Sequence, residues 1–424
     1  MNTDFSTEKT VCGRRVELRD GRLFVDGVYR FLKIGKPLRN FGDKADVEQL
    51  IADLDIIRAK NFNCLELNCY WHHLDRNGDG AVDVDLEPLR RLIDEINVRG
   101  MFASLSVETY GVGGGQIPAE FWNHHPDAVA IDSFGEQVKD TEYDYCSIVP
   151  SLFSPDYLKK SRAYIRDLTS KLDYSKILYF ETTVEPQYMG SRDIDYSVHA
   201  KTEYNNWVKQ NNIAGAPAFP ATFPVEKEFV LNPVWNRFRA EWLGGWVSGD
   251  AQVFRDAAGA DAWIASDYLD ANEESMTARC GEPLEFLRNL SGINIIQVNW
   301  HWHYGFREPN SKAYERVRRV MAETGRPWAI AEHMTINGTD YYAKEMDGLL
   351  RNTIHNSTRF GWEFVDIAAD PDSATVPEGK VQPGNFKPAH FSVYDKNWEP
   401  KPAMAVVDKQ WRQWMDEVYD GVYC

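Results

Sequence analysis

Two glutamates each close a short apolar run of β type: Glu185 in ILYFETTVEPQ and Glu332 in PWAIAEHMT. A carboxyl group that is partly buried beside a second negative charge keeps its proton near neutral pH and can act as an acid. Its ionised neighbour can then act as a nucleophile, and this division of roles is the one that cleaves a glycosidic bond. The competing interpretation is that each glutamate only pairs with a lysine or an arginine, as many strand-end acids do.

The elements that must position this pair follow a regular alternation of short apolar runs and helical periods. Strands are predicted to begin near residues 29, 63, 101, 176, 261, 293, 327 and 359, and helices to cover 47–60, 86–100, 155–172, 311–324, 340–354 and about 400–419. Repeated βα units build a parallel sheet, and eight of them predict an α/β protein with a (β/α)₈ TIM barrel. Active sites of such barrels lie at the carboxyl ends of the strands, where the fourth and seventh strands would carry Glu185 and Glu332.

The chain length of 424 residues suits one such domain, predicted over residues 1–424. The turns Asp20-Gly21 and Asp26-Gly27 predict a short N-terminal β-hairpin extension over 1–28. The connections after strands three and four, 108–150 and roughly 186–260, exceed ordinary loops and are expected to wall the cleft or carry local structure. Gly113-Gly114-Gly115 lacks a following GK[ST], so a nucleotide site is not predicted there.

Residues at or just past the predicted strand ends combine acids, amides, histidines and aromatic rings. Sugar hydroxyls need hydrogen-bonding groups of these types, and the apolar faces of sugars stack on flat rings. The substrate-binding residues predicted in this way are Arg39, Asn68, Trp71, Glu108, Tyr110, Asn299, His301, Tyr304 and Trp362.

The net charge of −17 argues against nucleic acid as a partner, because phosphate binding needs a basic surface. The chain shows no signal peptide and no run of about 18 apolar residues, which predicts a cytoplasmic protein with no membrane partner. Its six cysteines lack CxxC spacing and are expected to be reduced thiols rather than disulfides or a zinc site. The expected partner is an oligosaccharide or glycoside substrate, with no cofactor, and the sequence leaves a homo-oligomer open.

Two motifs imitate metal sites. DRNGDGAVD begins like a calcium loop, but its twelfth position is Leu86 where a bidentate glutamate is needed. His301-Trp302-His303 has the spacing of a zinc-binding HxH, and a metal-dependent hydrolase is therefore kept as an alternative. No metal site is predicted, because the acids at the strand ends already account for a hydrolytic reaction.

The chain resembles the retaining glycoside hydrolases of clan A, and most of all the family 42 β-galactosidases. The blocks that carry the resemblance are RLFVDGVYRFLKIG, LNCYWHHLDRNGDGAVDVDLEPLRRLIDEINVRG, IPAEFWNHHPDAVAIDSFG and FSPDYLKKSRAYIRDL. The resemblance implies that Glu185 is the acid/base and Glu332 the nucleophile. It further implies that Tyr304 holds the nucleophile in place and that Trp362 forms the floor of the sugar-binding site.

The chain departs from the clan pattern at Val184, where members usually carry an asparagine that binds the sugar 2-hydroxyl. That contact is expected from Asn68, Asn299 or Glu108 instead. Glu181 is a rival acid/base, although it falls within the predicted strand, whereas Glu185-Pro186 matches the clan's Glu-Pro pair. A β-galactoside is the first-choice substrate, with β-glucosidase, β-mannosidase or endo-acting hydrolase as alternatives, and a noncatalytic carbohydrate-binding barrel as the alternative from another class.

Overall fold

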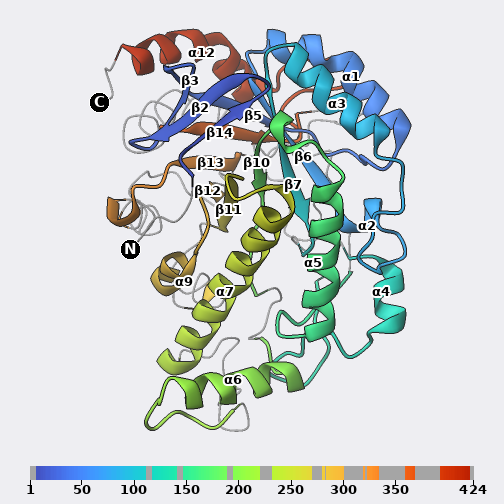
Figure 1. Ribbon diagram of the computed structural model, residues 1–424, viewed down its shortest axis with the longest axis vertical. Coiled ribbons are helices and arrows are strands. Elements are labelled where there is room, and N and C mark those ends of the chain that lie inside the picture. Colours follow the sequence, from blue (N-terminus) through green and yellow to red (C-terminus); the bar gives the residue numbers. More distant parts are fainter. Residues whose placement is uncertain are drawn as a thin grey trace.

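The computed structural model describes residues 6–110, 117–140, 147–188, 194–219, 232–269, 279–281, 283–299, 319, 322–333, 359–367 and 392–420. Eight parallel strands close into a barrel in the order β5–β6–β7–β10–β11–β12–β13–β14, with β14 paired to β5 (Figure 1). The strands are β5 (Leu32–Lys36), β6 (Cys64–Tyr70), β7 (Phe102–Glu108), β10 (Ile177–Glu181), β11 (Ile264–Leu269), β12 (Ile295–Asn299), β13 (Trp328–His333) and β14 (Gly361–Val365). The predicted TIM barrel is confirmed.

Alternate residues of each strand face opposite sides of the barrel wall, and this alternation decides which side chains can reach the interior. In β6, Leu65 and Leu67 pack outward in the main hydrophobic core, while Cys64 belongs to a second core inside the barrel. Glu66 lies between the two leucines and therefore points inward. Charged residues thus interrupt strands that are otherwise apolar on both faces.

The helices between the strands and solvent bury one apolar stripe each. The longer ones are α1 (Lys44–Ala59), α3 (Glu87–Val98), α5 (Pro155–Ser170), α6 (Val198–Gln210), α7 (Pro233–Ala258) and α12 (Pro402–Tyr419), and the shorter ones α2 (Trp71–Leu74), α4 (Ala119–His124), α9 (Pro283–Asn289) and the 3₁₀ turn Tyr174–Lys176. Side chains cap several amino ends: the Asp43 carboxylate accepts from the Ala45 N–H, and Ser154 Oγ accepts from the Tyr157 N–H. No helix of the described ranges is both long and apolar enough to cross a membrane.

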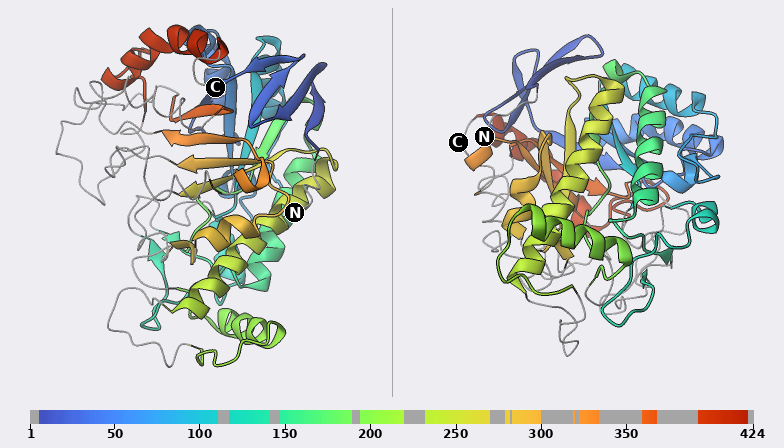
Figure 2. Two further views of the ribbon diagram at one scale, coloured as in Figure 1. Left: turned by 90° about the vertical axis from the view of Figure 1, so that its left-hand side faces the viewer. Right: turned by 60° about the horizontal axis from the view of Figure 1, so that its bottom comes forward.

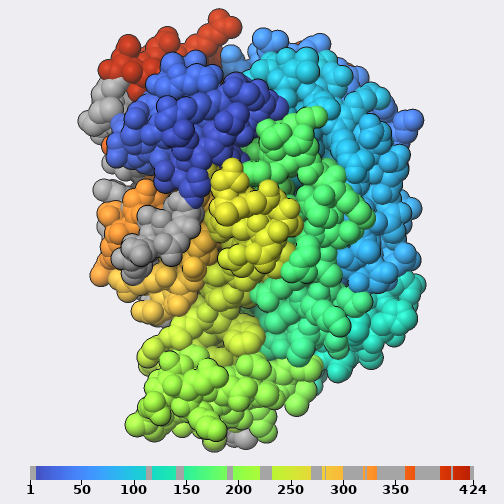
Figure 3. Space-filling view, viewed as in Figure 1, coloured from blue at the N-terminus to red at the C-terminus, as the bar shows by residue number. Residues whose placement is uncertain are grey.

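The predicted N-terminal hairpin is part of a larger, four-stranded antiparallel sheet. It consists of β1 (Glu8–Val11), β2 (Arg14–Arg19), β3 (Arg22–Val25) and β4 (Val28–Arg30). Its apolar face, including Val16 and Leu23, joins one core with residues such as Leu32 and Phe102 that begin barrel strands. The sheet therefore fills the amino end of the barrel, as the side view in Figure 2 shows, and its surface is the dark blue region of Figure 3.

The predicted single strand over 29–35 is two strands that meet at Phe31. β4 pairs with β3 in the N-terminal sheet, and β5 enters the barrel between β14 and β6. Phe31 is fully buried and packs outside the barrel near Trp411 of α12, with ring centroids 6.1 Å apart. The break arises because one apolar run serves two sheets, which the period of the run does not reveal.

The two long connections carry structure of their own. The segment after β7 contains α4 and a small ladder of β8 (Lys139–Asp140) and β9 (Ser147–Ile148). The segment after β10 contains α6, followed by the long helix α7 that leads to β11. Helix α6 lies at the end of the molecule away from the N-terminal sheet (Figures 1 and 2). The helix predicted over 340–354 and most of the one over 311–324 lie outside the described residues.

Candidate active site

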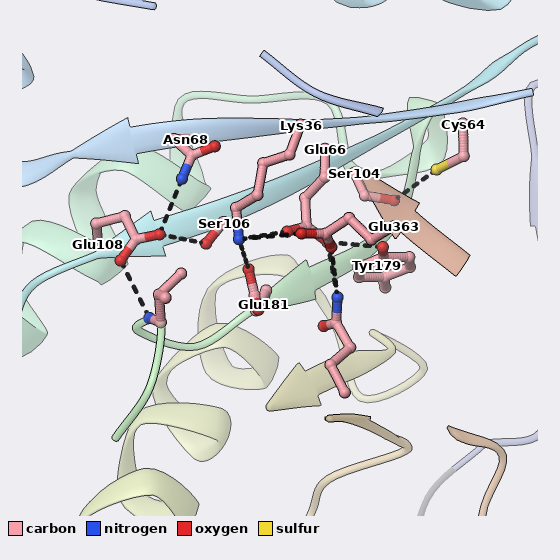
Figure 4. A network of polar contacts seen from close by, with 12 residues as sticks. Lys36, Cys64, Glu66, Asn68, Ser104, Ser106, Glu108, Tyr179, Glu181 and Glu363 are labelled. Carbon is pink, nitrogen blue, oxygen red and sulfur yellow. Dashed lines mark hydrogen bonds and ion pairs between the residues drawn. The ribbon is translucent and has the colours of Figure 1, made fainter. Parts of the chain in front are cut away.

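A cluster of charged side chains fills the middle of the barrel, and Lys36 is its centre (Figure 4). The Lys36 Nζ lies 3.0 Å from Oε1 of Glu66, 3.1 Å from Oε2 of Glu181 and 3.7 Å from Oε1 of Glu363. All four side chains are fully buried. Because four different strands supply them, the cluster ties opposite walls of the barrel together.

Neutral donors complete the cluster. The Tyr179 hydroxyl donates to Oε2 of Glu66 over 2.7 Å. The Gln297 amide donates to the same oxygen over 3.2 Å and to Oε2 of Glu363 over 3.0 Å. Such donors reduce the cost of burying a carboxylate, because they replace part of the water that it has lost.

The acids of this cluster hold their protons unequally. Burial raises the pKa of Glu181 well above its ordinary range, and the charges of Asp267 and Glu66 raise it further. Burial opposes ionisation of Glu66 as well, but the Lys36 ammonium and the hydrogen bonds from Glu181 and Tyr179 lower the pKa of Glu66. At neutral pH Glu181 is therefore the protonated member and Glu66 an ionised one. The rival acid/base Glu181 is thus part of the buried cluster, with its carboxyl group against Lys36.

A second group of polar side chains, at the carboxyl end of β7, is built around Glu108. Its Oε1 accepts from Asn68 Nδ2 over 3.1 Å and from Ser106 Oγ over 2.7 Å, and its Oε2 accepts from the Val184 N–H over 3.0 Å (Figure 4). Burial raises the pKa of Glu108 to about 7, although Lys36, the Ser106 hydroxyl and the Val184 N–H act in the opposite direction. Asn68 and Glu108, both predicted to bind substrate, are therefore brought together, and Glu108 also holds the chain just before Glu185.

Glu185 follows the end of β10 by four residues and is only 5% exposed. Its backbone is left-handed, with φ of 47°, a conformation that non-glycine residues adopt only when their surroundings hold them there. The Gln187 Nε2 donates to Oε2 of Glu185 over 3.1 Å, and Arg279 Nη1 donates to Oε1 of Gln187 over 2.6 Å. The charge of Glu185 also contributes to the pKa of Asp267, which burial raises to about 6. Glu185 therefore stands beside an inward-facing acid of the next strand.

Glu332 lies in β13, whose neighbours in the barrel are β12 and β14. Its backbone is thus near the carboxyl end of the seventh strand, while its side chain lies outside the described residues. Asn299 ends β12 with its side chain likewise outside them, and His301, His303 and Tyr304 fall wholly beyond the described ranges. The predicted roles of these residues stay predictions.

The structure corrects the expectation that Trp71 and Trp362 stack on a sugar. Trp362 is fully buried in the core outside the barrel wall and stacks on Phe364, with ring centroids 5.3 Å apart. Strand alternation explains this, because the neighbouring residue Glu363 faces the interior. Trp71 begins α2, stacks on Tyr164 with centroids 6.1 Å apart and donates through Nε1 to Asp75 over 2.8 Å.

The other two predicted contacts differ from each other in burial. Tyr110 is fully buried in the same outer core, edge-on to Trp246 of α7 with ring centroids 5.5 Å apart, and its N–H donates to Thr183 Oγ1. This packing corrects its prediction as a sugar contact. Arg39 follows β5 and is partly exposed, so its predicted role stays open to test.

Lys36, Glu66, Gln187 and Arg279 were not among the predicted site residues. Charged residues inside strands that are buried on both faces are rare unless they are paired, and this signal was present in YRFLKIGK and NCLELNC. No comparable signal marks Gln187 or Arg279, which meet only because the segments after β10 and β11 fold against each other.

A cavity of about 480 Å³ lies elsewhere, on the outer face of the helix layer. Residues of α5, α6, α7 and α9 line it, among them Trp207, Trp242 and Glu203. Neither Glu185 nor any residue of the Lys36 cluster belongs to its wall, so it is separate from the candidate site.

No protein-family model and no curated protein sequence matches the chain. Solved structures do match it in fold. A β-galactosidase from the psychrophilic Marinomonas ef1 superposes with a TM-score of 0.65 at 12% identity, over 92% of this chain and 62% of that one. A GH42 β-galactosidase from G. stearothermophilus gives a TM-score of 0.64 at 14% identity, over 93% and 56%. An exo-β-1,4-mannosidase from Opitutaceae bacterium strain TAV5 gives 0.56 at 14% identity, over 99% and 63%.

These likenesses confirm the predicted resemblance to clan A glycoside hydrolases at the level of fold. The chain spans less than two thirds of the length of the solved proteins just named, between 56% and 63%. What those proteins act on is therefore a guide for a proposal about this chain.

Proposed function

We propose that the protein is a retaining β-glycosidase in which Glu332 is the nucleophile and Glu185 the acid/base. The observation that supports it best is the placement of Glu185. It is nearly buried just past the fourth barrel strand, in a backbone conformation that its surroundings must hold, beside the inward-facing Asp267. A left-handed backbone at a buried acid on the rim of a barrel is a feature that functional residues often show.

The reaction proceeds by double displacement. In the first step an oxygen of Glu332 attacks the anomeric carbon while Glu185 gives its proton to the departing oxygen, which leaves a glycosyl ester on Glu332. In the second step Glu185, now ionised, takes a proton from water as that water attacks the same carbon and releases Glu332. Two inversions leave the configuration of the sugar unchanged.

We propose a short β-linked oligosaccharide or glycoside as the substrate, with a β-galactoside as first choice and β-glucosides and β-mannosides as alternatives. Asn68 supports a sugar contact at this site, because it is 2% exposed and its Oδ1 has no hydrogen-bond partner among the described residues. A buried acceptor of this kind favours a bound hydroxyl group. Asn68 would therefore take over the contact that an asparagine at position 184 makes in clan A.

We also propose that the protein acts in the cytoplasm. Four of the six cysteines, Cys12, Cys64, Cys69 and Cys280, are described, and all four are free thiols. Unpaired buried cysteines suit a reducing compartment.

A second candidate, a noncatalytic carbohydrate-binding barrel, is favoured by Val184, which replaces a side chain that binds sugar in the clan. Hydrolysis of a panel of nitrophenyl β-glycosides, followed by ¹H NMR, separates the two. The retaining enzyme is expected to release nitrophenol and to form the β-anomer of the sugar first. Release of the α-anomer first would contradict the double displacement, and binding of sugars without hydrolysis would favour the second candidate.

A further inference from the structure

The chain just after β10 is held from two sides, and a further contact, from Gln187, reaches the carboxyl group of Glu185 itself. On one side Glu108 accepts from the Val184 N–H over 3.0 Å. On the other side the Tyr188 N–H donates to the carbonyl oxygen of Arg279 over 2.6 Å. Glu185 lies between these two fixed points, which explains how its left-handed backbone persists.

The orientation of the Gln187 amide follows from its second partner. An arginine side chain can only donate hydrogen bonds, so the atom of Gln187 that faces Nη1 of Arg279 at 2.6 Å must be the amide oxygen. The NH₂ group of the same amide then faces Oε2 of Glu185 at 3.1 Å and can only donate to it. Gln187 is fully buried, so water does not compete for either contact.

This donation distinguishes the two oxygens of Glu185. In a protonated carboxyl group the carbonyl oxygen is the better acceptor, and the other oxygen carries the proton. A fixed donor at Oε2 therefore favours the acid form with its proton on Oε1. A general acid is effective only when its proton points at the departing oxygen, so the choice of oxygen matters for the reaction.

We propose that Gln187 and Arg279 are positioning residues that place the acid proton of Glu185 on Oε1. The inference rests on the proposed function, since it assigns a part in the same reaction. Arg279 orients the amide of Gln187, and the amide selects the oxygen of Glu185. Neither residue touches the reacting atoms.

The test uses leaving groups that differ in their need for a proton. A 2,4-dinitrophenyl β-glycoside leaves without help from an acid, whereas the phenyl β-glycoside of the same sugar needs the acid. In Gln187→Met and Arg279→Met we expect kcat/KM to fall by roughly tenfold or more on the phenyl substrate and by much less on the dinitrophenyl substrate. Arg279→Lys keeps a donor toward Gln187 and is expected to recover most of the loss.

Tyr188→Phe is the matched control. Its hydroxyl donates to the carbonyl oxygen of Arg239 over 2.9 Å, so the variant loses a buried hydrogen bond of the same segment without touching Glu185. We expect this variant to treat both substrates alike. Equal losses on both substrates in Gln187→Met, or no loss on either, would overturn the proposal.

An infrared measurement decides the inference without relying on activity. The carbonyl stretching band of protonated Glu185 is identified as the band that Glu185→Gln removes, and Gln187→Met is expected to shift it to higher frequency because the carbonyl oxygen loses a donor. An unchanged band would contradict the inference even in an active enzyme. A wild type that cleaves no aryl glycoside would contradict the proposed function, while the band would still decide whether Gln187 donates to Glu185.

Discussion

At the scale of single residues, the main feature of the barrel interior is one lysine that forms ion pairs with several buried acids. Lys36 contacts Glu66, Glu181 and Glu363 at full burial, and the proton that Glu181 keeps lowers the cost of this arrangement. A carboxyl group that keeps its proton adds no charge to the interior. The residues of the cluster should therefore differ sharply in their sensitivity to neutral substitution.

Removing the lysine should be far more costly than neutralising Glu181. Lys36→Met leaves ionised carboxylates without their cation, and we expect a loss of about 3–5 kcal/mol in the free energy of unfolding. Glu181→Gln replaces a group that is already neutral and is expected to cost about 1 kcal/mol. Urea unfolding of both variants at pH 7 checks this prediction. Similar losses in the two variants would mean that Glu181 is ionised, and abolished hydrolysis in Glu181→Gln would restore it as the acid/base.

Glu108 predicts a pH dependence of stability. Its pKa is raised by burial from 4.5 to about 7 in the folded protein, so between these values the folded state keeps a proton that the unfolded state has released. The stability that Glu108 contributes is then greatest below the lower value, falls as pH rises by about 1.4 kcal/mol per pH unit for one proton, and levels off above the higher value. Glu108→Gln is expected to flatten this decline between pH 5 and 7, as measured by urea unfolding at each pH. The same slope in both proteins would show that Glu108 does not take up the proton.

At the scale of elements, the N-terminal sheet stabilises the barrel by filling its amino end. Leu23 of β3 is fully buried in the core that this sheet shares with the barrel strands, whereas Val28 of β4 is 50% exposed. The stabilisation that such burial provides is roughly proportional to the apolar area removed from water. The sheet should therefore contribute through its inner face only.

Truncation of one residue on each face tests this role. Leu23→Ala creates a cavity between the sheet and the barrel, and we expect it to lower the free energy of unfolding by about 2–5 kcal/mol. The control Val28→Ala is expected to change it by no more than about 0.5 kcal/mol. Urea unfolding of both variants provides the measurement. A small effect in Leu23→Ala would indicate that the sheet unfolds separately from the barrel.

The alternation of apolar runs and helical periods was sufficient to predict the barrel, because each element has a local period. Strand ends were predicted within a few residues, and Glu185 was predicted at the rim from its position after the fourth strand. The direction of a side chain was harder to predict. Trp362 and Glu363 are neighbours that face opposite sides of the wall, and choosing between them requires the register of β14 against β5, which only the closed barrel fixes.

Contacts between segments far apart in the chain could not be predicted from local patterns. Lys36 and Glu181 meet across the barrel. Gln187 and Arg279 lie in two connecting segments that show no regular hydrophobic periodicity. The first contact depends on the closure of the barrel, and the second on how the segments after β10 and β11 fold against each other. The polar residues that position a site are thus less accessible to sequence analysis than the acids proposed to perform its chemistry.

At the scale of the whole molecule, the fold is shared with β-galactosidases and a mannosidase at 12–14% identity. A (β/α)₈ barrel supports many chemistries, so the proposed activity depends on two particular acids rather than on the architecture. Glu185 lies just past the fourth barrel strand and Glu332 in the seventh, and a retaining mechanism requires their carboxyl groups to lie about 5–5.5 Å apart. The decisive evidence must therefore come from the chemistry of these two residues.

The most direct measurement is azide rescue of Glu185→Ala and Glu332→Ala on an activated aryl β-glycoside that the wild type cleaves. We expect both variants to lose activity and azide to restore it. The product should be the β-glycosyl azide with Glu185→Ala, where azide replaces water in the second step, and the α-glycosyl azide with Glu332→Ala, where azide replaces the nucleophile. Unchanged hydrolysis by Glu332→Ala, or the same anomer from both variants, would contradict the assignment of the two roles.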